Sequence, residues 1–270
     1  MDYLARLIDG EAQRRQQLAI QRRLAAARFP CLKTLDAFDW TWPKKINRTQ
    51  VQNLFRLAFL HDHTNVIFLG GVGLGKSHLA SALGHAACLA GYSVLFTTAV
   101  DIINTLTAAQ TVCRLKAELK RFLAPRLLCV DELGYLPIDK TGADLLFQVI
   151  SQRYEQGSLL LTTNQPFKHW PKIFNNDSTL TSAALDRLLH HAETVVIEGK
   201  SYRMKDQIET PQPRAESLRA ARSSKPPFFM SSARATPGTF NPALSVMSAP
   251  ALIPSGWTRR APNSWRGEAA

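Results

Sequence analysis

The sequence predicts an α/β fold in which five parallel strands form one sheet, with helices on both faces. Three observations lead to this prediction. Short apolar segments alternate with helical segments after residue 65, a pattern typical of a parallel sheet covered on both sides. A glycine-rich loop joins the first apolar segment to a helix. The charges of residues 61–210 balance, with 14 basic and 14 acidic residues, as expected for a globular domain.

The net charge of +12 comes from the two ends of the chain. Residues 1–60 carry 11 Lys/Arg and 5 Asp/Glu, and residues 211–270 carry 8 and 2, so each end contributes +6. Basic flanks favour a polyanionic partner, most often nucleic acid. On charge alone, tails that are merely solvated are an equal alternative.

Composition excludes several classes of protein. A hydrophobic content of 45% in 270 residues excludes a wholly disordered chain. No apolar run reaches the roughly 18 residues of a membrane-spanning helix, and the acidic first ten residues do not form a secretory signal. The four cysteines contain no CxxC pair, which argues against disulfides and a zinc site. We therefore expect a cytoplasmic protein without membrane contact.

The first 61 residues are predicted to be helical on both sides of an irregular segment. Residues 1–28 have apolar residues at helical spacing, and Pro30 ends this helix. Residues 34–45 contain Trp40 and Trp42, which we expect to pack on the core, the alternative being stacking on a base or adenine. Residues 48–61 again have helical spacing.

Strands and helices then alternate, and the end of the chain has no period. The last sixty residues hold 9 of the 15 prolines and predict a disordered tail. We predict strands at 66–69, 93–97, 127–130, 159–163 and 194–197, and helices at 76–90, 100–106, 112–123, 142–154 and 180–190.

The glycine-rich loop matches the phosphate-binding pattern G-x-x-x-x-G-K-[ST] between a strand and a helix. Glycines let the backbone N–H groups approach phosphates, and the following helix N-terminus favours anions. Lys76 is expected to reach the β- and γ-phosphates of a bound nucleotide, and Ser77 to coordinate Mg²⁺. The cofactor-binding residues are Gly70, Gly71, Val72, Gly73, Leu74, Gly75, Lys76 and Ser77.

The strand at 127–130 ends in Asp131 and Glu132. We expect this strand to lie beside the strand at 66–69, so that its end meets the γ-phosphate. Asp131 would then hold the Mg²⁺ ion and Glu132 would act as general base for the attacking water. This acidic pair favours an ATPase over a GTPase. The alternative is that Asp131 and Glu132 only form an acidic turn between the strand and the following loop.

Three further polar residues are candidates for catalysis. Asn164 ends the fourth predicted strand and is placed to orient the attacking water, although asparagine is also common in turns. Arg187 and Arg203 flank the last strand, and arginine suits stabilisation of γ-phosphate charge. From spacing alone, an intramolecular ion pair explains Arg187 equally well.

Together, these segments resemble one known family. Residues 26–205 are similar to the IstB-like ATP-binding proteins, the ATPase helpers of insertion-sequence transposases, which are related to the DnaC helicase loaders within the AAA+ class. The resemblance rests on the phosphate loop and on the more specific segments 28–39, 131–135, 150–155, 163–167, 185–188 and 198–203.

The resemblance implies a P-loop NTPase of AAA+ type that binds Mg-ATP, assembles into a homo-oligomer on duplex DNA without sequence preference, and stimulates a cognate transposase. By position, Asn164 corresponds to the family's first sensor, Arg187 to an arginine finger acting in trans and Arg203 to the second sensor. The implied division is a basic helical segment at 1–45, shorter than in the family, an ATPase domain at 46–209, and a basic tail at 210–270. A helicase loader and a non-catalytic relic of a mobile element are the alternatives.

Basic residues on two predicted helices are the candidates for DNA contact, the alternative being ordinary solvated helix faces. We expect no metal at the pairs His61/His63 and His190/His191, because no third ligand lies at a suitable spacing. The candidate DNA-binding residues are Arg14, Arg15, Arg22 and Arg23 in the first helix, and Arg114, Lys116, Lys120 and Arg121 before the third strand.

Overall fold

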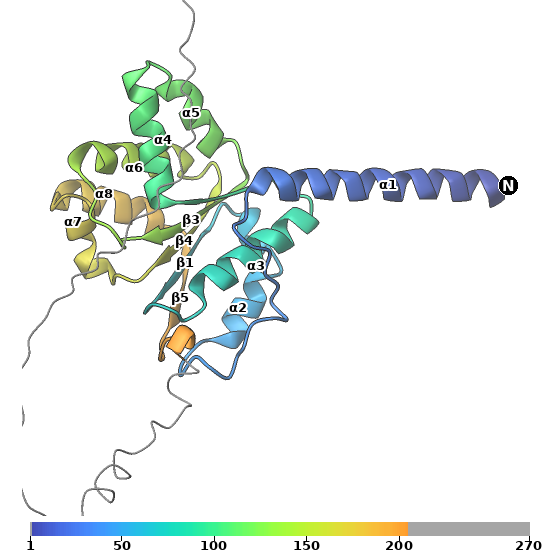
Figure 1. Cartoon of the computed structure of the whole chain (residues 1–270), viewed down its shortest axis with the longest axis horizontal. Helices are drawn as coiled ribbons and strands as arrows, with labels where there is room; N and C mark the ends of the chain where they lie inside the picture. The colour runs from blue at the N-terminus through green and yellow to red at the C-terminus, as the bar shows by residue number, and fades with distance from the viewer. Residues whose placement is uncertain (1, 205–270) are drawn as a thin grey trace, which may run out of the picture. The chain divides into compact units, whose positions relative to one another are not determined.

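The fold is taken from a computed structural model of the chain, which describes residues 2–204 (Figure 1). The predicted tail at 210–270 lies outside the described residues. Within residues 2–204, no helix combines the length and apolar character needed to cross a bilayer.

Five parallel strands form a single sheet, as the sequence predicts. The strands are β1 (Asn65–Gly70), β2 (Val94–Thr98), β3 (Leu127–Leu133), β4 (Ser158–Thr163) and β5 (Ala192–Ile197), in the spatial order β2-β3-β4-β1-β5. The expectation that β3 lies beside β1 is wrong, because β4 pairs with both strands and separates them. These strands are apolar on both faces, so their sequences do not show which strands pair with one another.

Alternate strand residues face two separate cores, as the two-residue period of a strand requires. In β1, Phe68 belongs to one core and Ile67 to the other. The first core is covered by α3 (Lys76–Leu89), α2 (Arg48–Leu54) and the end of α1 (Asp2–Ala27). The second is covered by α4 (Ala99–Thr111), α5 (Leu115–Leu123), α6 (Lys140–Arg153), α7 (Trp170–Ile173) and α8 (Ser178–Leu189) (Figure 1).

Side-chain caps determine where several helices begin. The oxygens of Asn47, Thr98, Asp139 and Asp177 accept hydrogen bonds from backbone N–H groups three residues later, at the starts of α2, α4, α6 and α8. The helices begin at residues 48, 99, 140 and 178, within two residues of the starts predicted from the sequence.

Two predicted helices are shorter than expected because a residue adopts a left-handed conformation. Leu57 has φ 60°, so α2 ends at Leu54 and the single turn η1 (Ala58–Leu60) follows. Cys113 has φ 54°, so α5 begins at Leu115 rather than at residue 112. Neither position is a glycine, and the periodicity therefore gave no sign of a break.

The segment between α1 and α2, residues 28–47, runs across α3, and we call it the linker. The Ser81 hydroxyl donates to the Cys31 carbonyl over 2.7 Å, and His78 Nε2 lies 2.9 Å from the Thr34 carbonyl. At its end, Lys45 forms an antiparallel bridge with Glu198, directly after β5. The linker is therefore held at both the phosphate-loop helix and the last strand.

Arg153, at the end of α6, is a buried cation with only 1% of its surface exposed. Its guanidinium donates to carbonyl oxygens at 2.9 to 3.2 Å, which closes the end of α5 and the approaches to β3 and β4. The acceptors are the carbonyls of Phe122, Leu123, Pro125, Arg126 and Ser158.

Candidate nucleotide-binding site

The glycine-rich loop connects β1 to α3 and needs glycine at two positions. Gly73 and Gly75 have φ values of 73° and 87°, a region that side chains disfavour. A Cβ at Gly73 would clash with the Ser201 hydroxyl, and one at Gly75 would lie 2.6 Å from the Phe38 ring. The loop is therefore both left-handed and closely packed by the linker and by the segment after β5.

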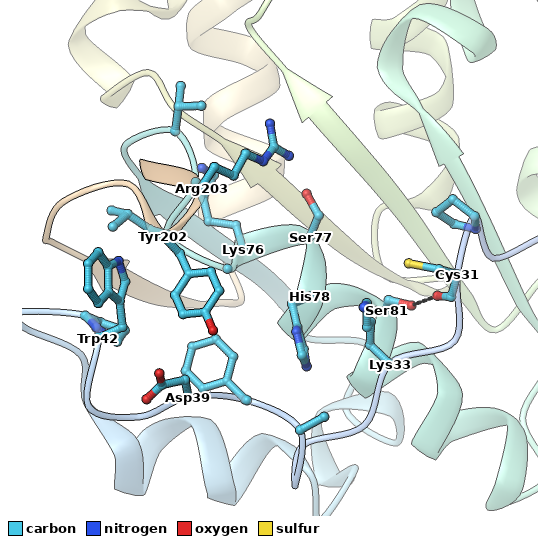
Figure 2. Close-up of a pocket in the computed structure, with 18 of the residues that line it drawn as sticks. Cys31, Lys33, Asp39, Trp42, Lys76, Ser77, His78, Ser81, Tyr202 and Arg203 are labelled. Carbon is cyan, nitrogen blue, oxygen red and sulfur yellow. Dashed lines mark hydrogen bonds between the residues drawn. The ribbon is translucent and has the colours of Figure 1, made fainter. Parts of the chain in front are cut away.

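The loop forms one wall of a cavity of about 570 Å³ (Figure 2). The opposite wall comes from the linker, which contributes Phe38 and Trp42. Glu132, Tyr135, Tyr202 and Arg203 also line the cavity. A cavity of this size suits a nucleotide, with the loop positioned for phosphates and aromatic residues for a base.

Lys76 begins α3 and is almost fully buried, with 4% of its surface exposed. Its Nζ donates to the Gly71 carbonyl over 2.7 Å, so the ammonium closes the loop. Burial lowers the pKa of Lys76. The carboxylates of Asp131 and Glu132 oppose this shift, whereas Arg203 adds to it. An incoming phosphate would offer this buried ammonium a stronger acceptor than the carbonyl.

Ser77 and Asp131 offer adjacent oxygen ligands. The Ser77 hydroxyl donates to Asp131 Oδ1 over 2.9 Å, and the Thr162 hydroxyl donates to the same carboxylate oxygen. Asp131 is buried, so its carboxylate is held in place by these two hydroxyls. A hydroxyl next to a carboxylate is a donor set that Mg²⁺ prefers, and this pair therefore fits the metal that accompanies ATP.

Glu132 interrupts the regular alternation of β3. It has φ 61°, and the register between β3 and β4 shifts between Val130 and Leu133. Its N–H donates to the Thr162 hydroxyl over 3.0 Å instead of to the strand ladder. Neighbouring residues of a regular strand point to opposite faces, but this bulge leaves Glu132 on the cavity while Asp131 contacts Ser77.

Asn164 lies directly after β4, beside the start of the phosphate loop. With Gly70 and Gly71 it lines a neighbouring cavity of about 380 Å³. Its Oδ1 is buried and has no hydrogen-bond partner among the described residues. A buried amide oxygen without a partner is costly, and a bound water would satisfy it.

The two candidate arginines differ in position. Arg203 lines the nucleotide cavity (Figure 2). The N–H of the preceding Tyr202 donates to the Gly73 carbonyl over 2.8 Å. Arg187 lines neither of the two cavities described. Its guanidinium donates to the Ala183 carbonyl over 2.9 Å and lies 5.1 Å from the centre of the Phe147 ring. The fold brings Arg203 to the site and leaves Arg187 outside it.

The linker holds two tryptophans for which the sequence favours packing on the core, with stacking on a base or adenine as the alternative. Trp40 packs on the core as expected, with its ring centre 4.9 Å from that of Phe38. Trp42 instead lines the cavity, where its Nε1 donates to the Lys200 carbonyl over 2.8 Å and its ring meets Tyr202 edge to face. The spacing of the two tryptophans gave no sign of this difference, because residues two apart in an extended segment face the same side. The chain turns at Trp40 and Thr41, and this turn gives the two rings different surroundings.

The DNA-contact candidates lie on two elements away from the cavity lining. Those of the first group are on α1, where Arg14, Arg15 and Arg22 are exposed and Arg23 is half-buried. Arg15 pairs with Glu11 at 2.7 Å. Arg114, Lys116, Lys120 and Arg121 are exposed on α5 or its N-cap, and Arg121 lies 3.7 Å from Glu118.

The fold and the cavity define the class of the protein, an α/β P-loop nucleotide-binding protein. The chain is similar to solved AAA+ structures at a level that shows the fold. A crystal structure of the DnaC helicase loader has a TM-score of 0.50 at 22% identity, covering 61% of this chain and 96% of that one. AMPPCP-bound DnaA from Aquifex aeolicus has a TM-score of 0.51 at 20% identity, covering 72% and 61%.

Residues 1–210 match the family of IstB-like ATP binding proteins, and the chain belongs to this family. It is 42% identical over 205 residues to a protein of Pseudomonas aeruginosa described as an ATP-binding protein of insertion sequence IS21, covering 76% of this chain and 77% of that one. A counterpart from insertion sequence IS5376 of Geobacillus stearothermophilus is 38% identical, covering 76% and 81%. ATP is therefore the nucleotide that the cavity suits.

Proposed function

We propose that this chain is an ATPase that helps a transposase. In the proposed cycle it binds Mg-ATP, assembles with further copies on duplex DNA without sequence preference, and hydrolyses ATP to reset. The proposal divides the chain into an N-terminal segment at 1–45, made of the basic helix α1 and most of the linker, the ATPase domain at 46–209 and a tail at 210–270. The relatives described as insertion-sequence proteins support the transposition context.

The arrangement at the end of β3 carries the hydrolysis proposal. Asp131 contacts Ser77, where Mg²⁺ would be held, and Glu132 lines the same cavity one residue later. Glu132 would accept a proton from the attacking water, and Asn164 would orient that water through its unpaired Oδ1. Lys76 and Arg203 would neutralise phosphate charge.

The position of Arg187 supports a site that is completed by a second copy. Within its own chain, the guanidinium contacts Ala183 and Phe147 rather than the nucleotide cavity. We propose that Arg187 reaches the γ-phosphate of a neighbouring subunit, which would make turnover depend on assembly. An arginine supplied in trans is worth about 10³-fold or more in other P-loop enzymes.

The test is ATP turnover against protein concentration, with and without duplex DNA. The proposal predicts that turnover rises with concentration and with DNA, and falls in Arg187→Ala. Arg56→Ala, a change at an exposed arginine outside the cavity lining, is the matched control and should behave like the original protein.

A mixing experiment separates action in trans from a local effect of Arg187. Glu132→Gln still binds ATP and can therefore assemble but lacks the base, and Arg187→Ala lacks the finger, so each protein alone should have little activity. Mixed together, they form some interfaces with an intact Glu132 and an intact arginine, and activity should return. Failure of the mixture to regain activity would place Arg187 in its own site or in the core.

The basic surfaces of α1 and α5 would supply the affinity for DNA. Contacts with phosphates release counterions, so binding should weaken steeply with salt and show no sequence preference. Reversal of Lys116 and Lys120 to Glu should weaken binding and reduce the salt slope. Unchanged DNA affinity in this variant would remove α5 from the interface.

A helicase loader is the second candidate, because the DnaC helicase loader shares the fold. The two functions differ in their client. Stimulation of strand transfer by the transposase would support our proposal, whereas specific binding of a replicative helicase without such stimulation would support a loader. ATP binding without turnover at any concentration would indicate a non-catalytic protein.

A further inference from the structure

A cluster of potential metal ligands lies away from the nucleotide cavity, at the ends of α6 and α8. Glu155, His190 and His191 each offer one ligand atom, and these atoms lie within 4.8 Å of one another. Among the described residues, no other group of three or more His, Cys, Asp or Glu side chains has ligand atoms this close together. The sequence spacing provided only the two histidines, and the fold supplies Glu155 as the third ligand.

The backbone holds all three ligands in place. His190 caps α8, and its N–H donates to the Asp186 carbonyl over 3.0 Å. The His191 carbonyl accepts from the Asn65 N–H over 2.8 Å, which ties it to β1. Glu155 lies in the short turn between α6 and β4. The N–H groups of Gln156 and Gly157 donate to the Arg153 carbonyl at 3.0 and 3.1 Å, which closes the turn that carries Glu155. The backbone of each ligand is therefore hydrogen-bonded locally, and side-chain rotation would bring the three to a common ion.

Tyr154 provides a partner of the kind that orients metal-bound histidines. Its hydroxyl lies 2.8 Å from His190 Nδ1. When Nδ1 carries the ring proton and donates it to the Tyr154 oxygen, Nε2 is left with its lone pair free for a metal. Ligating histidines almost always donate their other ring N–H to such an oxygen, and loss of that partner typically costs 10- to 100-fold in metal affinity.

The chemistry of the group selects the ion. Two imidazoles and one carboxylate suit a borderline divalent ion, and Zn²⁺ takes two nitrogens and one oxygen at about 2.0 to 2.2 Å with a fourth position left for water. Ligand atoms in such a site lie about 3.4 Å apart, so modest rotation of these exposed side chains is enough. The C-terminus of α8 also favours a cation.

From this geometry we infer that Glu155, His190 and His191 form a Zn²⁺ site at the C-terminal end of α8. None of the three ligands lines the nucleotide cavity, and Zn²⁺ binding can therefore be tested without nucleotide. The site lies one helical turn after Arg187 on the same helix. An ion bound there would fix the last turn of α8, and thereby the segment that carries Arg187.

The experiment is a Zn²⁺ titration of the chelator-treated, full-length, nucleotide-free protein by calorimetry. Co²⁺ serves as a second probe, because its absorption spectrum reports the ligand type and geometry. Both are measured in a Cys31→Ser, Cys113→Ser background, since these two cysteines are exposed and thiolates bind Zn²⁺ strongly. The expected result is one Zn²⁺ per chain and a tetrahedral Co²⁺ spectrum.

Single changes then identify the ligands. Glu155→Gln, His190→Ala and His191→Ala should each weaken Zn²⁺ binding at least tenfold, and Tyr154→Phe about tenfold. The matched control is His61→Ala, because His61 also contacts a tyrosine, Tyr92, at 2.8 Å but belongs to no three-ligand group of the described residues. This control should bind Zn²⁺ like its parent.

The change in melting temperature on adding Zn²⁺ distinguishes loss of metal binding from a general loss of stability in a variant. Zn²⁺ should raise the melting temperature of the parent and of His61→Ala, but not that of the three ligand variants, because only a native-state site is stabilised by mass action. Absence of Zn²⁺ binding by the parent, or equal binding by all variants, would overturn the assignment. No nucleotide is present, so either result leaves the ATPase proposal untouched.

Discussion

The Ser77 hydroxyl donates a 2.9 Å hydrogen bond to Oδ1 of Asp131, although β4 separates the two strands that lead to these residues. The contact forms because parallel strands end at one edge of the sheet, where the phosphate loop bends toward β3. Thr162 of β4 occupies the gap and donates to the same oxygen. This arrangement makes the Asp131 carboxylate the meeting point of the loop, β3 and β4.

Asp131→Asn should remove the dependence of ATP binding on Mg²⁺. The amide has the shape of the carboxylate and keeps an oxygen for Ser77, but it lacks the negative charge that attracts the ion. ATP affinity measured with Mg²⁺ should fall to the value measured with chelator. Asp101→Asn, at the exposed start of α4, is the control. A variant that retains the full Mg²⁺ effect would show that Asp131 is not a metal-site residue.

Lys76→Ala should weaken ATP binding strongly. The change removes a buried ammonium that is poised at the loop, and charged hydrogen bonds of this kind contribute about 2 kcal/mol or more, roughly 30-fold in Kd. Fluorescent-nucleotide titration measures the loss. Lys172→Ala changes an exposed lysine of α7 and should bind normally. Near-normal affinity in Lys76→Ala would contradict the phosphate role.

Glu132→Gln should bind ATP as well as the original protein but hydrolyse it about 100-fold or more slowly. Glutamine preserves the size of the side chain and cannot accept the proton of the attacking water. Because hydrolysis would reset the cycle, this protein should also stay on DNA longer in the presence of ATP. Single-turnover hydrolysis and DNA dissociation rates test both statements. Retained turnover would remove Glu132 as the base.

The sequence predicted the strands, the phosphate loop and the adjacent carboxylates, because each depends on local pattern. It did not predict that β4 lies between β1 and β3, since the order of strands depends on packing between distant segments. It also did not predict the left-handed conformation of Glu132. A glutamate at φ 61° is held by tertiary contacts, among them the hydrogen bond from its N–H to Thr162.

The linker is the other part of the site that local patterns did not predict. Residues 34–45 have no period and were expected to be irregular, which is correct, but their position depends on side chains of α3. His78 and Ser81 contact backbone carbonyls of the linker. Every residue has a backbone carbonyl, so the sequence does not show which carbonyls these side chains will contact. Only the fold brings Trp42 to the cavity. For Arg187, the spacing alone did not distinguish a role at the γ-phosphate from an intramolecular ion pair. Its contacts place it outside the cavity lining of its own chain.

Trp42→Ala should weaken ATP binding by about 1 kcal/mol, roughly fivefold in Kd, if the indole packs on the adenine. Its ring lines the cavity next to Tyr202, so loss of the ring opens the side where the base would lie. Trp42→Phe keeps an aromatic face and should lose less. The comparison with inorganic triphosphate is decisive, because triphosphate affinity should not change. An equal loss for both ligands would indicate damage to the loop rather than to a base pocket.

Arg153→Ala should destabilise the fold by about 3 kcal/mol or more. Five carbonyl oxygens depend on this guanidinium, and a buried alanine would leave them without a donor. Burial lowers the pKa of Arg153 to about 10, so the side chain stays charged at neutral pH and is stabilised by these oxygens rather than by an acid. Arg153→Lys keeps the charge with fewer, less directed donors and should lose an intermediate amount. Urea unfolding at constant m-value measures both, with the exposed Arg56→Ala as control. A loss below 1 kcal/mol in Arg153→Ala would mean that water replaces the guanidinium at the ends of α5 and α6.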